Sequence, residues 1–212
     1  PGSPAAGRSS TRRPERSHGS ALTRVPHLHL HVTTPAEFAE GLAAIRAELD
    51  VPAAFPVAVE AAAETAASRG PGEGAARVDR RDLELVTVDP PGSRDLDQAY
   101  GAERRGSGYR VHYAIADVAA FVAAGGALDG ESRDRGVTLY LPDGRSPLYP
   151  PVLGEGAASL LPEEDRPAVL WTLDLDQRGV LVDVAVERAV VRSRRQLDYR
   201  SVQAAVDDGS AA

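Results

Sequence analysis

The sequence of 212 residues is long enough for one sizeable domain with an extension, and its 42% hydrophobic and 26% charged residues are typical of a globular protein. No apolar run approaches the length that crosses a bilayer, no secretory leader is visible and cysteine is absent, so we expect a cytoplasmic protein without membrane contacts or disulfides. The net charge of -7 argues against a broad basic surface for nucleic acid, although it leaves room for a nuclease in which bound cations neutralise phosphate.

The N-terminal part of the chain divides into an extension and a lead-in. Residues 1–26 are rich in Arg, Pro, Ser and Gly and have too little apolar surface to fold, so we expect them to be disordered. The segment His27-Leu28-His29-Leu30-His31 alternates with the period of a strand. Its three imidazoles could bind a metal, but we favour a short, partly exposed strand. The lead-in, residues 27–81, contains this strand, predicted helices over 34–49 and 56–68, and a Gly/Pro-rich linker at 69–74.

From residue 82 onwards the pattern changes to short alternating segments that are typical of strands, separated by turn residues. Gln177-Arg178-Gly179 indicates a hairpin turn between the last two strands, and a helix is predicted over 196–206. We therefore expect an α+β fold with a mixed, mostly antiparallel sheet, preceded by two short helices. The predicted strands are 83–88, 109–115, 137–141, 168–175 and 180–191.

An acidic loop follows the first of these strands. Asp89 ends the apolar strand, Pro90-Pro91-Gly92 force a tight turn, and Asp95 and Asp97 point the same way if the backbone is extended. Three converging carboxylates would raise one another's pKa values, and a hard divalent cation with oxygen ligands, Mg²⁺ or alternatively Mn²⁺, would remove that conflict. The alternative is a solvated acidic turn in which Arg94 offsets the charge.

Six short segments, spread from Thr87 to Tyr199, carry a family resemblance. They are the acidic loop from Thr87 to Ala99, Ala114 to Val118, Arg135 to Pro142, Pro147 to Leu153, Ala158 to Pro167, and Arg192 to Tyr199. Together and in this order they resemble the ribonuclease II family and its catalytic RNB domain, although each segment alone is weak evidence. The resemblance implies metal-dependent hydrolytic removal of 5′-nucleoside monophosphates from the 3′ end of single-stranded RNA.

The resemblance also implies roles for residues of the acidic loop. Asp89 and Asp95 would be metal ligands, and Asp97 would be the acid on which catalysis depends most. Two divalent cations about 4 Å apart can activate water and stabilise the leaving oxygen, which agrees with these roles. Gln98 stands where the family commonly has a second adjacent Asp. It would offer the metal a neutral carbonyl oxygen or hold a metal-bound water.

Three residues outside the loop would contact RNA by the same resemblance. Tyr140 would stack on the terminal base and Tyr199 on a neighbouring base, which suits an enzyme that tolerates any sequence. Packing at a sheet edge is the alternative for both tyrosines. Arg135 would contact phosphate, and its alternative is an internal ion pair with Asp117 or Asp134.

The chain also lacks parts that the family usually has. No cold-shock-like or S1-like RNA-binding module is recognisable, and the later section of the family domain, with an Arg thought to clamp phosphate, lies beyond Ala212. We therefore expect residues 82–212 to be an incomplete N-terminal portion of the catalytic domain, monomeric and inactive on its own. Two alternative functions are a catalytically weakened or truncated RNA-binding module of the same fold and a different metal-dependent phosphohydrolase that shares only the acidic loop.

Overall fold

The computed structural model describes residues 36–72 and 76–210. The extension over 1–26 and the strand over 27–31 lie outside this part, so both stay predictions. Contacts divide the chain into two units, residues 1–44 and 45–212, and helix α1 (Ala36–Glu48) begins in the first and ends in the second. No helix among the described residues is both long and apolar enough to span a bilayer.

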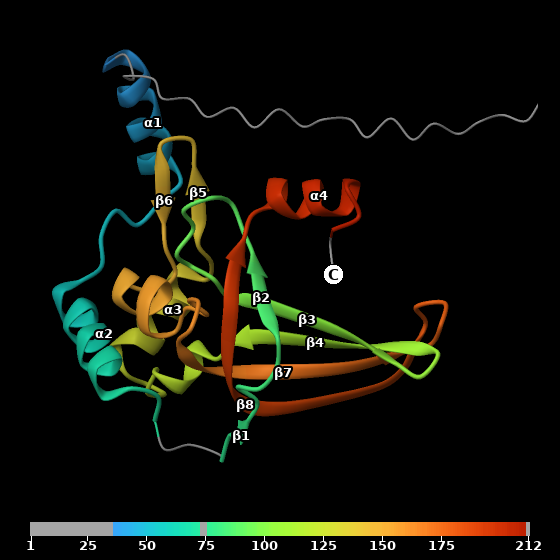
Figure 1. Cartoon of the computed structure of the whole chain (residues 1–212). Coiled ribbons are helices and arrows are strands. Elements are labelled where there is room, and N and C mark those ends of the chain that lie inside the picture. The colour runs from blue at the N-terminus through green and yellow to red at the C-terminus, as the bar shows by residue number, and fades with distance from the viewer. Residues whose placement is uncertain (1–35, 73–75, 211–212) are drawn as a thin grey trace, which may run out of the picture. The chain divides into compact units, whose positions relative to one another are not determined.

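The second unit is built around a six-stranded mixed sheet (Figure 1), which confirms the predicted α+β fold. Its strands are β1 (Val78–Asp79), β2 (Leu85–Val88), β3 (Gln98–Arg105), β4 (Gly108–Ala116), β7 (Asp165–Leu175) and β8 (Leu181–Leu197). Strands β2, β3, β4 and β7 pair antiparallel in that order. The long strand β8 pairs antiparallel with β7 and, through its last residues, parallel with β2, so that five strands form a closed ring. Strand β1 adds to β8 in parallel.

The sheet buries one face, as the alternation of side chains along its strands requires. Ala99, Ala114 and Leu170 are neighbours across β3, β4 and β7, and all three are buried in one core with Leu85 and Leu96. The next row along the strands belongs to the opposite face, which is partly open to solvent. This row consists of Tyr100, Tyr113, Trp171 and Val186.

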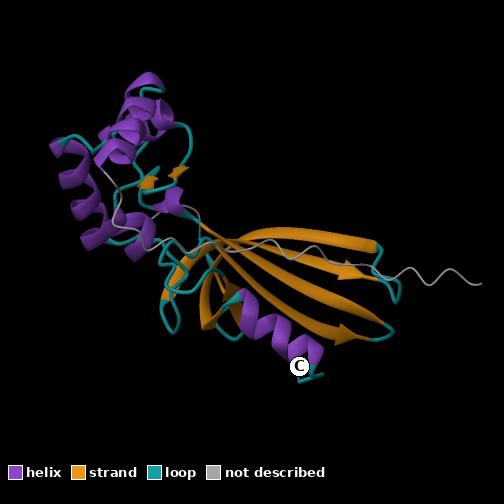
Figure 2. Ribbon diagram, turned by 90° about the horizontal axis from the view of Figure 1, so that it is seen from above, coloured by secondary structure: helices purple, strands orange, loops and turns teal. Residues whose placement is uncertain are grey.

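A helical layer lies at the end of the sheet away from the β3–β4 and β7–β8 hairpin turns (Figure 2). Helix α2 (Val57–Arg69) buries Val59, Ala63 and Ala66, whose spacing of four and three residues places them on one face. They pack in a second core with residues of α3 (Ala127–Arg135) and of a π-helical turn, η2 (Leu153–Ala157). The hairpin of β5 (Leu139–Leu141) and β6 (Gly144–Ser146) precedes this turn.

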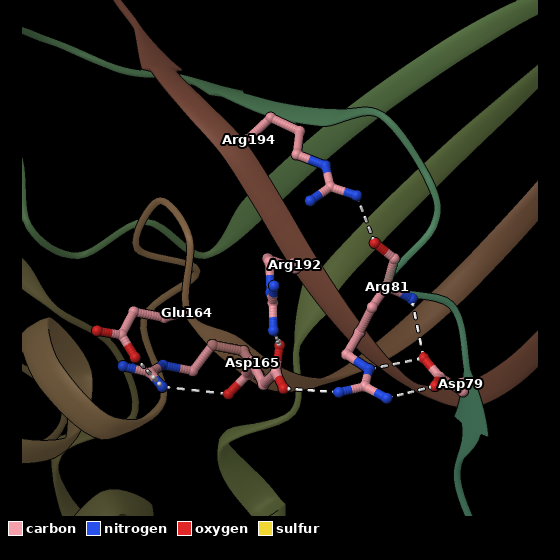
Figure 3. Close-up of polar contacts among 7 residues, drawn as sticks. Asp79, Arg81, Glu164, Asp165, Arg192 and Arg194 are labelled. Carbon is pink, nitrogen blue, oxygen red and sulfur yellow. Dashed lines mark hydrogen bonds and ion pairs between the residues drawn. The ribbon is translucent and has the colours of Figure 1, made fainter.

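Strand β1 is fastened to the sheet by a chain of ion pairs (Figure 3). The Arg81 guanidinium lies 2.6 Å from Asp79 and 3.0 Å from Asp165, and Arg192 of β8 reaches the other oxygen of Asp165 at 2.7 Å. Arg194 donates a hydrogen bond of 2.6 Å to the Arg81 carbonyl. A strand of only two residues therefore gains contacts that its two backbone pairings alone do not supply.

Some elements differ from the sequence expectations. Strand β3 and helix α3 were not predicted, because β3 ends in charged residues and α3 is short and mostly polar. The helix predicted over 196–206 begins later, as α4 (Tyr199–Asp207). Strand β8 runs on to Leu197, and the Asp198 carboxylate then caps the helix by accepting hydrogen bonds from the amides of Arg200 and Ser201.

Candidate active site

The acidic loop is held in place by its backbone at both ends. The Asp89 amide donates to the Leu197 carbonyl at 3.1 Å, which continues the pairing of β2 with β8, and the Asp97 carbonyl accepts from the Ala116 amide at 2.9 Å. Between them Leu96 is fully buried, so Asp95 and Asp97 on either side of it are directed away from the core. The sequence pattern predicted this shared direction.

The buried Ser159 hydroxyl fixes the middle of the loop. Its Oγ accepts a hydrogen bond of 3.0 Å from the Leu96 amide and donates one of 2.6 Å to the Arg94 carbonyl. The Leu160 amide also donates to the Leu96 carbonyl at 2.7 Å. The loop that carries the acids is therefore tied to the segment that follows η2, more than sixty positions later in the chain.

One cavity of about 490 Å³ brings most of the predicted site residues together. In Figure 1 the β5–β6 hairpin and α4 stand on either side of the ends of β2 and β8. The cavity is lined by residues of this hairpin, by Asp89 directly after β2 and by Tyr199 of α4. Of its described lining residues, four are acidic and one is basic. The charged and tyrosine residues of the lining are Asp89, Asp95, Asp97, Glu155, Arg145, Tyr140, Tyr149 and Tyr199.

Two of the acids have no basic partner within reach among the described residues. Burial raises the pKa of Asp89, and the charges of Asp97 and Asp95 raise it further. Burial also raises the pKa of Asp97, helped by the charge of Asp95 and opposed by a hydrogen bond from the Asp97 amide. Neither carboxylate accepts a hydrogen bond from an arginine or tyrosine of residues 36–72 and 76–210. Positive charge brought to this place would therefore stabilise both.

Asp95 is in a different situation, because Arg145 of β6 holds it. Arg145 Nη1 lies 2.7 Å from Asp95 Oδ2, and its Nη2 lies 2.6 Å from Glu155 Oε1. The Tyr140 hydroxyl is 3.4 Å from the same Asp95 oxygen. Burial lowers the pKa of Arg145, but the charges of Asp95 and Glu155 more than offset this and raise it. Sequence reasoning missed Arg145 and Glu155, since no local pattern indicates a pair that is 50 positions apart.

The donor chemistry of this cavity fits a divalent cation, although the side chains are not gathered into a finished ligand set. Asp89, Asp95 and Asp97 offer only carboxylate oxygens, the ligands that Mg²⁺ and Mn²⁺ prefer. Within the described part of the chain, no three acidic or imidazole side chains lie close enough together to hold a metal as they stand. A metal held by all three acids would require these side chains to move closer together, and the ion pair with Arg145 restrains Asp95.

The two tyrosines predicted to stack on RNA bases both line the cavity. Tyr140 lies on β5 and is 73% exposed, and Tyr199 is the first residue of α4 and is 54% exposed. Neither ring is packed at a buried sheet edge, the alternative interpretation of the pattern. The structure leaves both rings accessible to a planar ligand, and their role in binding RNA stays a prediction.

Gln98 is not where a metal ligand of this cavity is expected. It does not contribute to the lining, and its Oε1 accepts hydrogen bonds from the hydroxyls of Tyr100, at 2.6 Å, and Tyr113, at 2.9 Å. The two tyrosine rings are stacked with centroids 5.0 Å apart. Both lone pairs of the Gln98 oxygen are thus in use, and the predicted metal ligation through this atom would require at least one of these hydrogen bonds to break.

Arg135 is not placed to contact RNA, which corrects the sequence prediction. Its side chain is only 3% exposed and pairs with Glu131 at 2.7 Å, one helical turn earlier. The guanidinium also donates to Ser146 Oγ and lies over the Phe55 ring, 3.8 Å from its centroid. An internal ion pair was the alternative, but its partner is neither of the predicted acids. Asp117 pairs instead with Arg77 at 3.0 Å.

Comparisons with known proteins agree with this fold. The RNB domain model matches residues 77–212. Ribonuclease R of Escherichia coli (strain K12) is 38% identical over 155 residues, which are 72% of this chain and 19% of that protein. A protein of Arabidopsis thaliana named inactive exonuclease DIS3L2 is 39% identical over 137 residues, 63% of this chain and 13% of that protein.

A solved structure shows the same fold. Ribonuclease R of Mycoplasma genitalium in complex with double-stranded RNA matches with a TM-score of 0.72 and 26% identity, over 81% of this chain and 31% of that chain. The chain thus spans less than a third of the relatives that it matches. Because the family model covers well over half of its residues, including the whole acidic loop, this chain belongs to the RNB domain family, together with ribonuclease R and related exonucleases.

Proposed function

We propose that this chain carries the acidic half of the active site of a metal-dependent exoribonuclease, which degrades single-stranded RNA from its 3′ end to 5′-nucleoside monophosphates. One observation carries the proposal: Asp89, Asp95 and Asp97 line one cavity together with the exposed rings of Tyr140 and Tyr199. The cavity volume of about 490 Å³ is in the range of sites for small ligands, about 300–1,000 Å³, which suits a terminal nucleotide.

The three aspartates would hold Mg²⁺, or Mn²⁺ in its place. Bound there, a divalent cation supplies positive charge to the phosphodiester and lowers the pKa of water. Asp97 is the acid on which we expect activity to depend most. Its carboxylate pairs with no arginine of residues 36–72 and 76–210, and its backbone carbonyl accepts a hydrogen bond from β4. Asp89 and Asp95 line the same cavity, and the fixed Leu96 backbone limits how far Asp95 and Asp97 move apart.

The tyrosines would orient the RNA. Stacking on Tyr140 and Tyr199 recognises the flat face that every base has, and it is worth about 1–3 kcal/mol for each base. An exonuclease of this kind needs to hold the last nucleotides without reading their sequence. The direction of degradation and the mononucleotide product rest on the family resemblance.

The test is release of labelled 5′-mononucleotides from a uniformly labelled single-stranded RNA by the full-length protein. We expect activity with Mg²⁺, none in excess chelator, and a loss of at least about a hundredfold in Asp97→Asn, because removing one essential group typically costs this much. Asp183→Asn, at an exposed acid of β8, is the matched control and should keep wild-type activity. Equal activity of Asp97→Asn and wild type would contradict the proposal.

A second candidate function is RNA binding without cleavage. It is favoured by the Gln98 side chain, which brings no charge and is held by two tyrosine hydroxyls, and by Arg145, which neutralises Asp95. RNA retained on a filter and recovered intact after long incubation with Mg²⁺ would support this function over the exonuclease.

A further inference from the structure

Arg145 is placed to do more than balance charge. It is the one basic residue among the described residues of the cavity lining, and its register partner across the β5–β6 hairpin is Tyr140. Cross-strand partners project from the same face of a hairpin, so the guanidinium and the tyrosine ring face the cavity together. The Tyr140 ring, which would stack on a base, and the Arg145 guanidinium, which would bind phosphate, thus project from neighbouring positions of adjacent strands.

The guanidinium is shared between two acids of the cavity. One edge of Arg145 faces Asp95 at 2.7 Å and the other faces Glu155 at 2.6 Å, and about a third of the Arg145 side chain is exposed. Arginine binds carboxylate and phosphate through the same planar set of N–H donors. If Asp95 turned away, Glu155 would still hold one edge of Arg145, and the other edge would be free for an anionic oxygen.

A divalent cation and Arg145 compete for the same carboxylate. The proposed metal site needs the Asp95 oxygens, and Arg145 already occupies Oδ2. A cation bound at Asp95 would also repel the guanidinium and weaken the remaining attraction. Metal binding and release of Arg145 are therefore coupled.

We infer that Arg145 is a phosphate-binding residue of the cavity. Its ion pair with Asp95 occupies the guanidinium until a divalent cation binds the Asp95 carboxylate and frees it. The inference rests on the proposed function, and it adds a residue to which the RNB resemblance assigned no role. It implies an order of events: the cation binds first, and the RNA phosphate then meets both the cation and the freed edge of Arg145. Glu155 keeps the guanidinium at the cavity wall throughout.

If Arg145 competes with the cation for Asp95 and also binds phosphate, removing its side chain should raise the affinity for Mn²⁺ and lower the affinity for RNA. In Arg145→Ala, Mn²⁺ titrated calorimetrically into the 212-residue chain should bind about fivefold more tightly, because an exposed ion pair of this kind contributes up to about this factor. In the presence of Mn²⁺, a short fluorescein-labelled oligoadenylate should bind about tenfold more weakly, since a charge-assisted hydrogen bond to phosphate is lost. Arg145→Lys should keep part of the RNA affinity, because it retains the charge without the two-edged geometry.

Arg94→Ala is the matched control for general electrostatics. Arg94 is exposed, directly precedes Asp95, and makes no ion pair with residues of the described ranges. Its removal should change Mn²⁺ affinity less than twofold. Unchanged or weaker Mn²⁺ binding by Arg145→Ala, or unchanged RNA binding, would overturn the inference. Asp97→Asn separates the two proposals: wild-type Mn²⁺ affinity in that variant counts against the proposed metal site itself, and not against the competition at Asp95.

Discussion

The Ser159 hydroxyl provides the sharpest test of how the acidic loop is held. In Ser159→Ala the Leu96 amide loses its acceptor, and this amide belongs to a residue that is fully buried. An unpaired buried N–H costs about 1–3 kcal/mol. The Arg94 carbonyl also loses its donor, but Arg94 is exposed and water can replace that bond. We therefore expect the free energy of unfolding to fall by about 2 kcal/mol.

Urea unfolding followed by fluorescence measures this loss, because Trp171 of β7 is the single tryptophan. Ser132→Ala is the control: its hydroxyl only donates to the Asp129 carbonyl within α3, and we expect a change below about 0.5 kcal/mol. Mn²⁺ affinity should fall in Ser159→Ala, since Asp95 and Asp97 flank the loosened residue. A loss of stability no greater than in the control would refute the view that Ser159 anchors the loop.

Three further predictions follow from other parts of the structure. Leu170→Ala should lower the free energy of unfolding by about 3 kcal/mol in the same urea assay, because Leu170 is buried in the sheet core. Gln98→Asp should change Mn²⁺ affinity less than about twofold in calorimetry, because residue 98 lies outside the cavity lining and next to Tyr100 and Tyr113. Hydrogen bonds from the Ser201 and Arg200 amides lower the pKa of Asp198, so its capping contribution is present above about pH 4 and lost as pH falls. The stability gap between wild type and Asp198→Ala should narrow accordingly between pH 7 and pH 3.

Each of these has a contrary result. A loss below about 1 kcal/mol in Leu170→Ala would mean that the core relaxes around the missing side chain. Clearly tighter Mn²⁺ binding by Gln98→Asp would show that residue 98 reaches the cation. A stability gap that stays constant with pH would show that the Asp198 carboxylate is not the group that caps α4.

Local patterns were sufficient to predict most of the strands and the acidic loop. Alternation identified β4, β7 and most of β8, and the spacing of Asp95 and Asp97 predicted that both side chains point the same way. Strand β3 was not predicted, because its charged end, Glu103 to Arg105, does not alternate in polarity. Its pairing with β4 determines its conformation. Tertiary pairing overrides weak local preference there.

The site was harder to predict wherever partners are distant in sequence. Gln98 was expected to face a metal, but the hydroxyls of Tyr100 and Tyr113 capture its oxygen, and only the register of β3 against β4 brings Tyr113 there. Arg135 was assigned to RNA, yet the fold buries it against Phe55. No role was predicted for Arg145, because it lies on β6 and its partner Asp95 lies in the acidic loop, far away in the sequence.

The closed ring of strands has a consequence for synthesis on the ribosome. Strand β2 is synthesised early, but its parallel partner is the end of β8. The hydrogen bond from the Asp89 amide to the Leu197 carbonyl can form only after Leu197 has been synthesised. The contact between Arg81 and Arg194 joins residues 113 positions apart. Such long-range closure is slow compared with the formation of local hairpins. A nascent chain therefore completes β3–β4 and β7–β8 first, and the acidic loop acquires its final shape only after nearly all of these residues have left the exit tunnel.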